Sequence, residues 1–132
     1  MKKGFTLIEL MVVILIVGIL AAVAIPIMRG RIDSAKWSEG KAMAGTIATA
    51  LRAYGAEKGN TGVWPPSITD LGFDVSDFDG TYFDSTNFAW DDAAYDYSAT
   101  PPLTYTITVT KGIGITTPDT VTLDHTGTWV IP

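Results

Sequence analysis

At 132 residues, with 47% hydrophobic and 17% charged residues, the chain has room for one small domain beside a strongly apolar N-terminus. It contains no cysteine, which excludes a disulfide framework and any thiolate metal site or nucleophile. One Lys and ten Asp give residues 61–132 a net charge of −9, against +4 from eight basic and four acidic residues in 1–60, so the C-terminal part should repel nucleic acid.

The N-terminal segment is long and apolar enough to cross a membrane. After the basic pair Lys2–Lys3, residues 5–25 read FTLIELMVVILIVGILAAVAI and are interrupted only by Thr6, Glu9 and Gly18. About 20 such residues span the core of a bilayer. The basic pair favours a cytoplasmic N-terminus, although further basic residues follow the segment.

The same segment allows a second interpretation, an ordinary secretory signal peptide. The basic pair would be its n-region, the apolar run its h-region, and Ala22-Val23-Ala24 a cleavage site that leaves Ile25 first. Glu9 argues against this interpretation, because an ionisable residue at the centre of a spanning helix costs on the order of 3 kcal/mol. A carboxylate in this position needs a partner.

Gly4-Phe5-Thr6-Leu7-Ile8-Glu9, followed by the apolar run and Pro26, resembles the prepilin signature of type IV pilins and type II secretion pseudopilins. The resemblance is close over residues 1 to about 30 and looser beyond them. It implies that a membrane-embedded prepilin peptidase cuts after Gly4 and methylates the new amino terminus of Phe5. Residues 1–4 would then be a leader peptide, and residues 5–25 a transmembrane and filament-core helix.

Glu9 lies one helical turn from the amine that this cut would create. Two opposite charges about 4 Å apart attract by about 4 kcal/mol at an effective dielectric near 20, before desolvation is subtracted. The pair could form within one chain or between Glu9 and the Phe5 amine of a neighbouring subunit, and the resemblance implies the second. We therefore predict Phe5, Glu9, Gly18 and Pro26 as assembly residues.

An amphipathic pattern continues the helix beyond Pro26. Because Pro26 lacks a backbone donor, we expect the helix to kink or loosen there. Apolar residues nevertheless recur at three- and four-residue spacing from Ile32 to Tyr54, and Gly55 or Gly59 supplies a stop. The sequence predicts one nearly continuous helix from Phe5 to Tyr54, apolar on every face in its first half and on one face in its second.

Trp37 lies off the apolar stripe of this helix. It could pack under a loop or mark a subunit interface, and ordinary packing is favoured because tryptophans are usually largely buried.

Residues 26–132 are expected to form an exported domain with an amphipathic helix at 27–55, an acidic loop at 60–93 and a β-sheet at 94–132. A helical turn is expected at Ser67–Leu71, and the alternation of apolar residues and threonines predicts the clearest strand at Leu103–Thr110. The expected pairing partners are Ala94–Thr100, Gly112–Thr117, Val121–His125 and Thr128–Ile131. The predicted fold class is thus α+β and type IV pilin-like, with a long N-terminal helix packed on a small antiparallel sheet.

Acidic side chains are most closely spaced in the acidic loop. Its candidate metal ligands are Asp74, Asp77, Asp79, Asp84, Asp91 and Asp92, with Asp96 close behind. Carboxylate oxygens suit calcium, and the resemblance implies a calcium site in this part of the fold, as major pseudopilins have. The spacing does not match an EF-hand loop, and solvated acidic loops that keep the domain soluble are the favoured alternative.

The sequence contains few residues of the types that carry out catalysis. The only histidine, His125, falls in an expected hairpin, where we expect it to face solvent at a strand end. Asp91 and Asp92 are a paired carboxylate, but adjacent residues on a strand point to opposite faces. We therefore predict that the chain is not an enzyme.

The sequence predicts a structural subunit that polymerises through its N-terminal helix into a type IV pilus or a type II secretion pseudopilus. The resemblance implies storage in the inner membrane with the C-terminal domain outside the cytoplasm. It also implies three partners: copies of the chain or related subunits, the prepilin peptidase and an inner-membrane assembly platform. The alternative is a signal-anchored exported binding module with an acidic, calcium-binding β domain. Many pilins close a loop with a pair of cysteines, and this chain has none. The absence favours a pseudopilin or a cysteine-free pilin.

Overall fold

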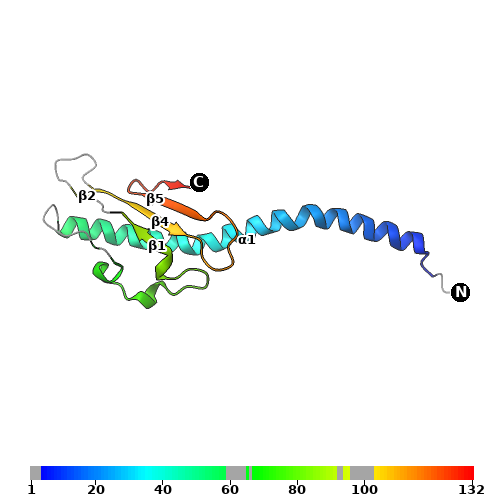
Figure 1. Cartoon of the computed structure of the whole chain (residues 1–132), viewed down its shortest axis with the longest axis horizontal. Coiled ribbons are helices and arrows are strands. Elements are labelled where there is room, and N and C mark those ends of the chain that lie inside the picture. Colours follow the sequence, from blue (N-terminus) through cyan, green and yellow to red (C-terminus); the bar gives the residue numbers. More distant parts are fainter. Residues whose placement is uncertain (1–3, 59–64, 66, 92–93, 96–102) are drawn as a thin grey trace. The chain divides into compact units, whose positions relative to one another are not determined.

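The computed structural model describes residues 4–58, 65, 67–91, 94–95 and 103–132 (Figure 1). These residues form one long helix, several single 3-10 turns and short antiparallel strands. In chain order the elements are α1 (Leu7–Lys58), η2 (Thr69–Leu71), η3 (Val75–Phe78), η4 (Ser85–Asn87), β1 (Phe88–Trp90), β2 (Ala94–Tyr95), β3 (Leu103–Thr104), β4 (Thr106–Thr110), β5 (Thr120–Asp124) and β6 (Trp129–Val130). The chain divides into two compact units, Met1–Ser34 and Ala35–Pro132.

Helix α1 is continuous over 52 residues, which confirms the predicted long helix and extends it to Lys58. Pro26 lies inside α1 without ending it. The loss of one backbone donor is therefore tolerated, with the turns on either side remaining helical. Gly55 lies within the helix and is therefore not its stop, and Gly59 lies outside the described residues.

The first unit is a bare apolar helix. Its large apolar side chains between Leu7 and Met28 are 49% to 77% exposed. It is the part of α1 that makes this helix long and apolar enough to cross a membrane. An apolar helix without protein cover on any face needs lipid or other helices around it.

In the second unit, the remainder of α1 packs on a small sheet. The buried residues come from the helix (Trp37, Ala44, Ile47, Ala48, Leu51), from the strands and the Tyr105 link between them (Phe88, Tyr105, Ile107, Val109, Val121, Leu123) and from loops (Ile68, Phe78, Phe83, Ile115). The Tyr105 hydroxyl donates a hydrogen bond of 3.4 Å to the carbonyl oxygen of Ala48, which ties sheet to helix. This helix-on-sheet arrangement confirms the predicted α+β class and its pilin-like layout.

The sheet is antiparallel throughout, with strand order β1-β4-β5-β6, and β2 and β3 form a separate antiparallel pair. Ile107 lies opposite Leu123 and Val109 opposite Val121, and all four side chains are buried. Threonines occupy the alternate positions on the other face of the sheet. The predicted alternation in β4 and the predicted hairpin of β5 and β6 are therefore confirmed.

The prediction of a strand at Gly112–Thr117 is wrong. The segment is a loop that crosses the segment around Tyr82, and the Ile113 backbone N–H donates to the Tyr82 carbonyl oxygen at 2.7 Å. A Cβ at Gly112 would collide with the same carbonyl, so only glycine permits this approach. Backbone packing on another loop thus replaces strand pairing here.

Strand β1 lies within residues 60–93, which were expected to form an acidic loop. It pairs with β4 through Phe88 opposite Val109, and the Trp90 indole N–H donates to the Pro65 carbonyl oxygen at 2.8 Å. Of the predicted strand Ala94–Thr100, residues 94–95 form β2, and residues 96–100 lie outside the described residues.

Candidate functional site

The bond predicted for cleavage lies just before the first helix. Gly4 and Phe5 precede α1, are exposed and have no regular secondary structure, and the Phe5 side chain is 87% exposed. No protein atom would come within 4 Å of a Cβ at Gly4. Residues 1–3 of the predicted leader lie outside the described residues. The Gly4–Phe5 bond is thus open to an enzyme, and whether one cuts it remains a prediction.

Glu9 closes a hydrogen-bonded ring at the start of α1. Its Oε2 accepts hydrogen bonds from the Thr6 backbone N–H at 2.8 Å and from the Thr6 hydroxyl at 2.6 Å. In return, the Glu9 backbone N–H donates to the Thr6 hydroxyl oxygen at 3.4 Å. This reciprocal pattern is a capping box, and the spacing Thr-x-x-Glu before an apolar run is the sequence signal that predicts it.

The capping box gives Glu9 a partner that the sequence analysis missed. The expected partner, an amine at Phe5, requires the cut, and in the chain described here Phe5 is still joined to Gly4 by a peptide bond. Thr6 satisfies the carboxylate within the uncut chain. The charge on Glu9 remains without an opposite charge among the described residues.

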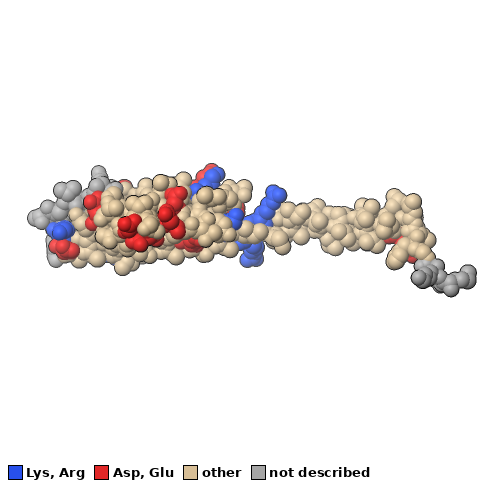
Figure 2. Space-filling model, turned by 90° about the horizontal axis from the view of Figure 1, so that it is seen from below, with Lys and Arg blue, Asp and Glu red and all other residues tan. Residues whose placement is uncertain are grey.

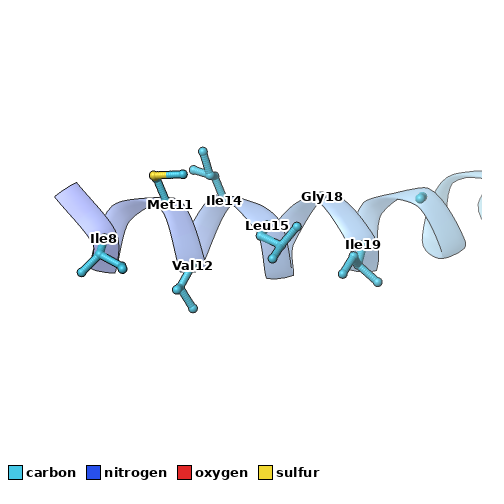
Figure 3. Close-up of a pocket in the computed structure, with 8 residues that line it drawn as sticks. Ile8, Met11, Val12, Ile14, Leu15, Gly18 and Ile19 are labelled. Carbon is cyan, nitrogen blue, oxygen red and sulfur yellow. The ribbon is translucent and has the colours of Figure 1, made fainter.

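Gly18 leaves a notch in the apolar surface of α1. The notch is lined by Ile8, Met11, Val12, Ile14, Leu15, Gly18, Ile19 and Ala22 (Figure 3). In Figure 3 Met11 and Ile14 point to one side of the helix, and Ile8, Val12, Leu15 and Ile19 point to the other. A Cβ at Gly18 would touch nothing within 4 Å. Small residues of this kind let a second helix approach closely.

The predicted calcium ligands are engaged in local turns. Asp74 Oδ1 accepts a hydrogen bond from the Ser76 backbone N–H at 3.0 Å, and Asp77 Oδ2 accepts one from the Asp74 backbone N–H at 2.9 Å. These two bonds cap the start of η3, and Asp79 is the C-cap residue at its end. Asp84 caps η4 in the same way, and Asp91 Oδ1 accepts from the Thr106 backbone N–H at 2.8 Å. Aspartate suits the positions before η3 and η4 because it is a strong N-cap residue.

Among the residues that the structure describes, no three Asp, Glu or His side chains lie together as a metal site would require. Figure 2 shows acidic side chains spread over one face of the second unit. Asp92 and Asp96 lie outside the described residues. Calcium binding stays a prediction. A chelator that lowers the melting temperature would support it, and one that leaves it unchanged would reject it.

The capping hydrogen bonds predict how acid should affect the second unit. The Thr86 hydroxyl and then the Thr86 backbone N–H lower the pKa of Asp84 below its usual value. A lowered folded-state pKa contributes stability above the unfolded value of about 3.9, and this contribution is lost as pH falls through the folded pKa.

Asp84→Asn should therefore keep most of the stability at neutral pH, since Asn also caps, but should show a smaller fall of melting temperature below about pH 4. Asp84→Ala, which loses the cap, should melt lower at every pH. Melting curves between neutral and acidic pH check both. An Asp84→Asn curve that matches the parent's acid dependence would contradict this account.

A polar clamp at the start of the second unit was not predicted. Glu39 Oε1 accepts hydrogen bonds from the backbone N–H groups of Tyr82 at 2.8 Å and Phe83 at 3.2 Å. Lys36 Nζ donates to the Gly114 carbonyl oxygen at 2.6 Å. These two helix side chains hold two loops far along the chain, and no periodicity in the sequence signals such pairings.

Trp37 is buried in the core of the second unit. This burial confirms ordinary packing, the interpretation that was favoured over a subunit interface. Its ring lies 5.3 Å from that of Phe83, and its indole N–H donates to the Thr117 carbonyl oxygen at 3.3 Å. His125 lies in the turn after β5, edge-on to Tyr105, with ring centroids 6.5 Å apart.

Parts of the chain match known proteins. The family model described as the prokaryotic N-terminal methylation motif matches residues 1–25. A fimbrial protein of Eikenella corrodens is 40% identical over 84 residues, which cover 64% of this chain and 52% of that protein. A type IV major pilin of Neisseria gonorrhoeae is 46% identical over 72 residues, covering 54% and 41%.

Type II secretion system core protein G of Pseudomonas aeruginosa is 49% identical over 53 residues, covering 40% of this chain and 37% of that protein. The chain thus spans about half the length of these curated relatives or less. No solved structure matches the chain.

Proposed function

We propose that this chain belongs to the type IV pilin and type II secretion pseudopilin family and is a structural subunit of a filament of that kind. The matched methylation motif and the similar pilins and pseudopilin support the proposal. The observation that carries the proposal is the bare apolar helix of the first unit, which begins directly behind the Gly4–Phe5 motif. Such a surface requires lipid before assembly and other helices after it.

Processing would precede assembly. Cleavage after Gly4 by a prepilin peptidase and methylation of the new terminus would leave Phe5 with a cationic amine at the start of α1. The subunit would wait in the inner membrane, its apolar helix in lipid and its second unit outside the cytoplasm. An assembly platform in that membrane would then extract it into the filament.

Docking would use the two charges that processing leaves in the apolar segment. Before the cut, Thr6 satisfies Glu9 through two hydrogen bonds. After the cut, the Phe5 amine of a neighbouring subunit offers Glu9 an opposite charge in a medium of low dielectric, where an unpaired charge is costly. A subunit that enters the filament in register neutralises both charges.

Gly18 should matter for helix contact within the filament, and Gly18→Leu tests this. The substitution fills the notch, so we expect filament yield to fall by roughly tenfold or more, the effect of losing about 1.4 kcal/mol of docking free energy. The helix itself should gain, because Gly is about 1 kcal/mol worse than Ala in a helix interior. Electron microscopy and immunoblots of sheared filaments measure the yield.

Gly30→Leu is the matched control, since a Cβ at Gly30 also meets nothing within 4 Å and this residue lies outside the notch. Equal filament yields from both variants would show that the notch at Gly18 has no special role in packing.

The proposed role is assembly without catalysis, in keeping with relatives named as fimbrial and pilin proteins. The competing function, an exported binding module on a plain anchor, would leave the chain monomeric in the membrane. Filaments purified from cells that produce an epitope-tagged chain separate the two. The proposal expects the tag along the length of the filaments, and a tag confined to the membrane fraction as monomer would reject it.

A further inference from the structure

Two arginines follow the apolar part of α1. Arg29 and Arg31 are exposed and follow within three residues of Met28, which is 64% exposed. The salt bridges of the described residues join other side chains, and neither arginine has a side-chain partner in that part of the chain. Figure 2 shows basic side chains that project from the helix where its apolar stretch ends.

The two arginines point to different sides of the helix. Residues two apart in an α-helix are separated by about 200° around its axis, so Arg29 and Arg31 lie on nearly opposite faces. A single flat protein surface can meet only one of them at a time. A layer that surrounds the helix can meet both.

The length of the apolar stretch fits such a layer. From Leu7, where α1 begins, to Arg29 the helix rises about 33 Å at 1.5 Å per residue. This exceeds the hydrocarbon core of about 30 Å and lies within the roughly 40–45 Å that includes both headgroup regions. With Phe5 at one headgroup region, both guanidinium groups reach the other, helped by their long apolar stems.

We propose that Arg29 and Arg31 bind the phosphates of anionic lipid headgroups in the outer leaflet and thereby fix the depth of the stored subunit. The inference rests on the proposed function, which places α1 across the inner membrane. Guanidinium groups bind phosphate oxygens with two parallel hydrogen bonds, and they are always charged. Each basic residue near an anionic surface strengthens the association about fivefold.

The test measures lipid selectivity of the unassembled full chain. The chain is placed in nanodiscs of equal parts phosphatidylglycerol and phosphatidylcholine, and spin-labelled forms of each lipid report how strongly each associates with the protein. Arg29→Gln/Arg31→Gln should lower the preference for phosphatidylglycerol by roughly tenfold or more, with about half of that on a logarithmic scale from either single change. High salt should reduce the parent's preference toward that of the double variant.

Lys58→Gln is the matched control, because it removes one positive charge near the far end of α1, where Lys58 already contacts Glu57 at 3.1 Å. It should leave the lipid preference unchanged. An unchanged preference in the double variant would overturn the inference, and if that variant also lost its filaments the arginines would be assigned to a neighbouring subunit instead.

Failure of this inference is distinguishable from failure of the proposed function. Loss of lipid preference with normal filaments supports lipid binding and leaves the filament proposal intact. A parent chain that does not enter the nanodiscs would overturn the membrane placement on which both depend.

Discussion

Replacing Glu9 with glutamine should leave the subunit in the membrane and nearly abolish its filaments. The substitution removes the negative charge that would neutralise the Phe5 amine of a neighbour. The attraction of such a pair is about 4 kcal/mol before desolvation, so the docking equilibrium could weaken by up to about a thousandfold. Membrane fractionation and electron microscopy of sheared filaments measure the two outcomes separately.

The hydrogen bonds between Thr6 and Glu9 make Glu9→Gln a selective test of the charge. Glutamine still accepts a hydrogen bond from Thr6 at the start of a helix, so Glu9→Gln keeps the cap and loses only the charge. Thr6→Val is the complementary control, because it removes the hydroxyl that bonds Glu9 and keeps the charge. It should cost about 1 kcal/mol of helix stability and leave most filaments intact.

A reversed result would assign Glu9 to the helix start. If Thr6→Val lost its filaments while Glu9→Gln kept them, the capping box would be the functional feature, and the pairing of Glu9 with a neighbouring terminus would be rejected.

Phe83→Ala should have the largest effect on stability in the second unit. Phe83 is among the largest fully buried side chains, and its ring packs against those of Trp37 and Phe88 and over Gly40. Truncating a buried phenylalanine costs about 3–5 kcal/mol, which for a domain of this size lowers the melting temperature by more than about 10 °C. Thermal unfolding in detergent, followed by tryptophan fluorescence, checks this.

Ile113→Ala is the control for that experiment. Its side chain is 77% exposed, so removing it should change the stability by no more than about 0.5 kcal/mol. Similar melting temperatures for both variants would show that the cluster around Phe83 does not hold the unit together.

The elements with strong apolar periodicity could be predicted from the sequence. The three- and four-residue spacing from Ile32 to Tyr54 predicted that the helix continues, but it misplaced part of the packed face. Ile32 is exposed, whereas the buried face runs through Trp37 and Ala44. The Thr-alternating pattern predicted β4. The hairpin of β5 and β6 followed from Thr126-Gly127, and Gly127 has the positive φ of 88° that its turn requires. In β4 and in the hairpin the local signal agrees with the tertiary packing, because alternate residues and a turn glycine each allow one arrangement.

The rest depended on contacts that residue types alone do not specify. Aspartates that cap η3 and η4 have the same composition as a set of calcium ligands, so the acidic loop suggested a metal where the structure shows turns. The bonds from Glu39 to the 82–83 backbone and from Lys36 to Gly114 link distant segments without a periodic signal. At Glu9 two signals overlap, because an ionisable residue in an apolar run is costly in lipid and the spacing Thr6-x-x-Glu9 also forms a capping box.

The amine that Glu9 is proposed to meet exists only after the cut between Gly4 and Phe5. The most direct test is mass spectrometry of the N-terminal peptide of the protein taken from its native membrane. We predict a chain that begins at Phe5 and carries one methyl group on its amino terminus. A chain that retains Met1, or one that begins at Ile25 as signal-peptide cleavage would leave it, would contradict the account.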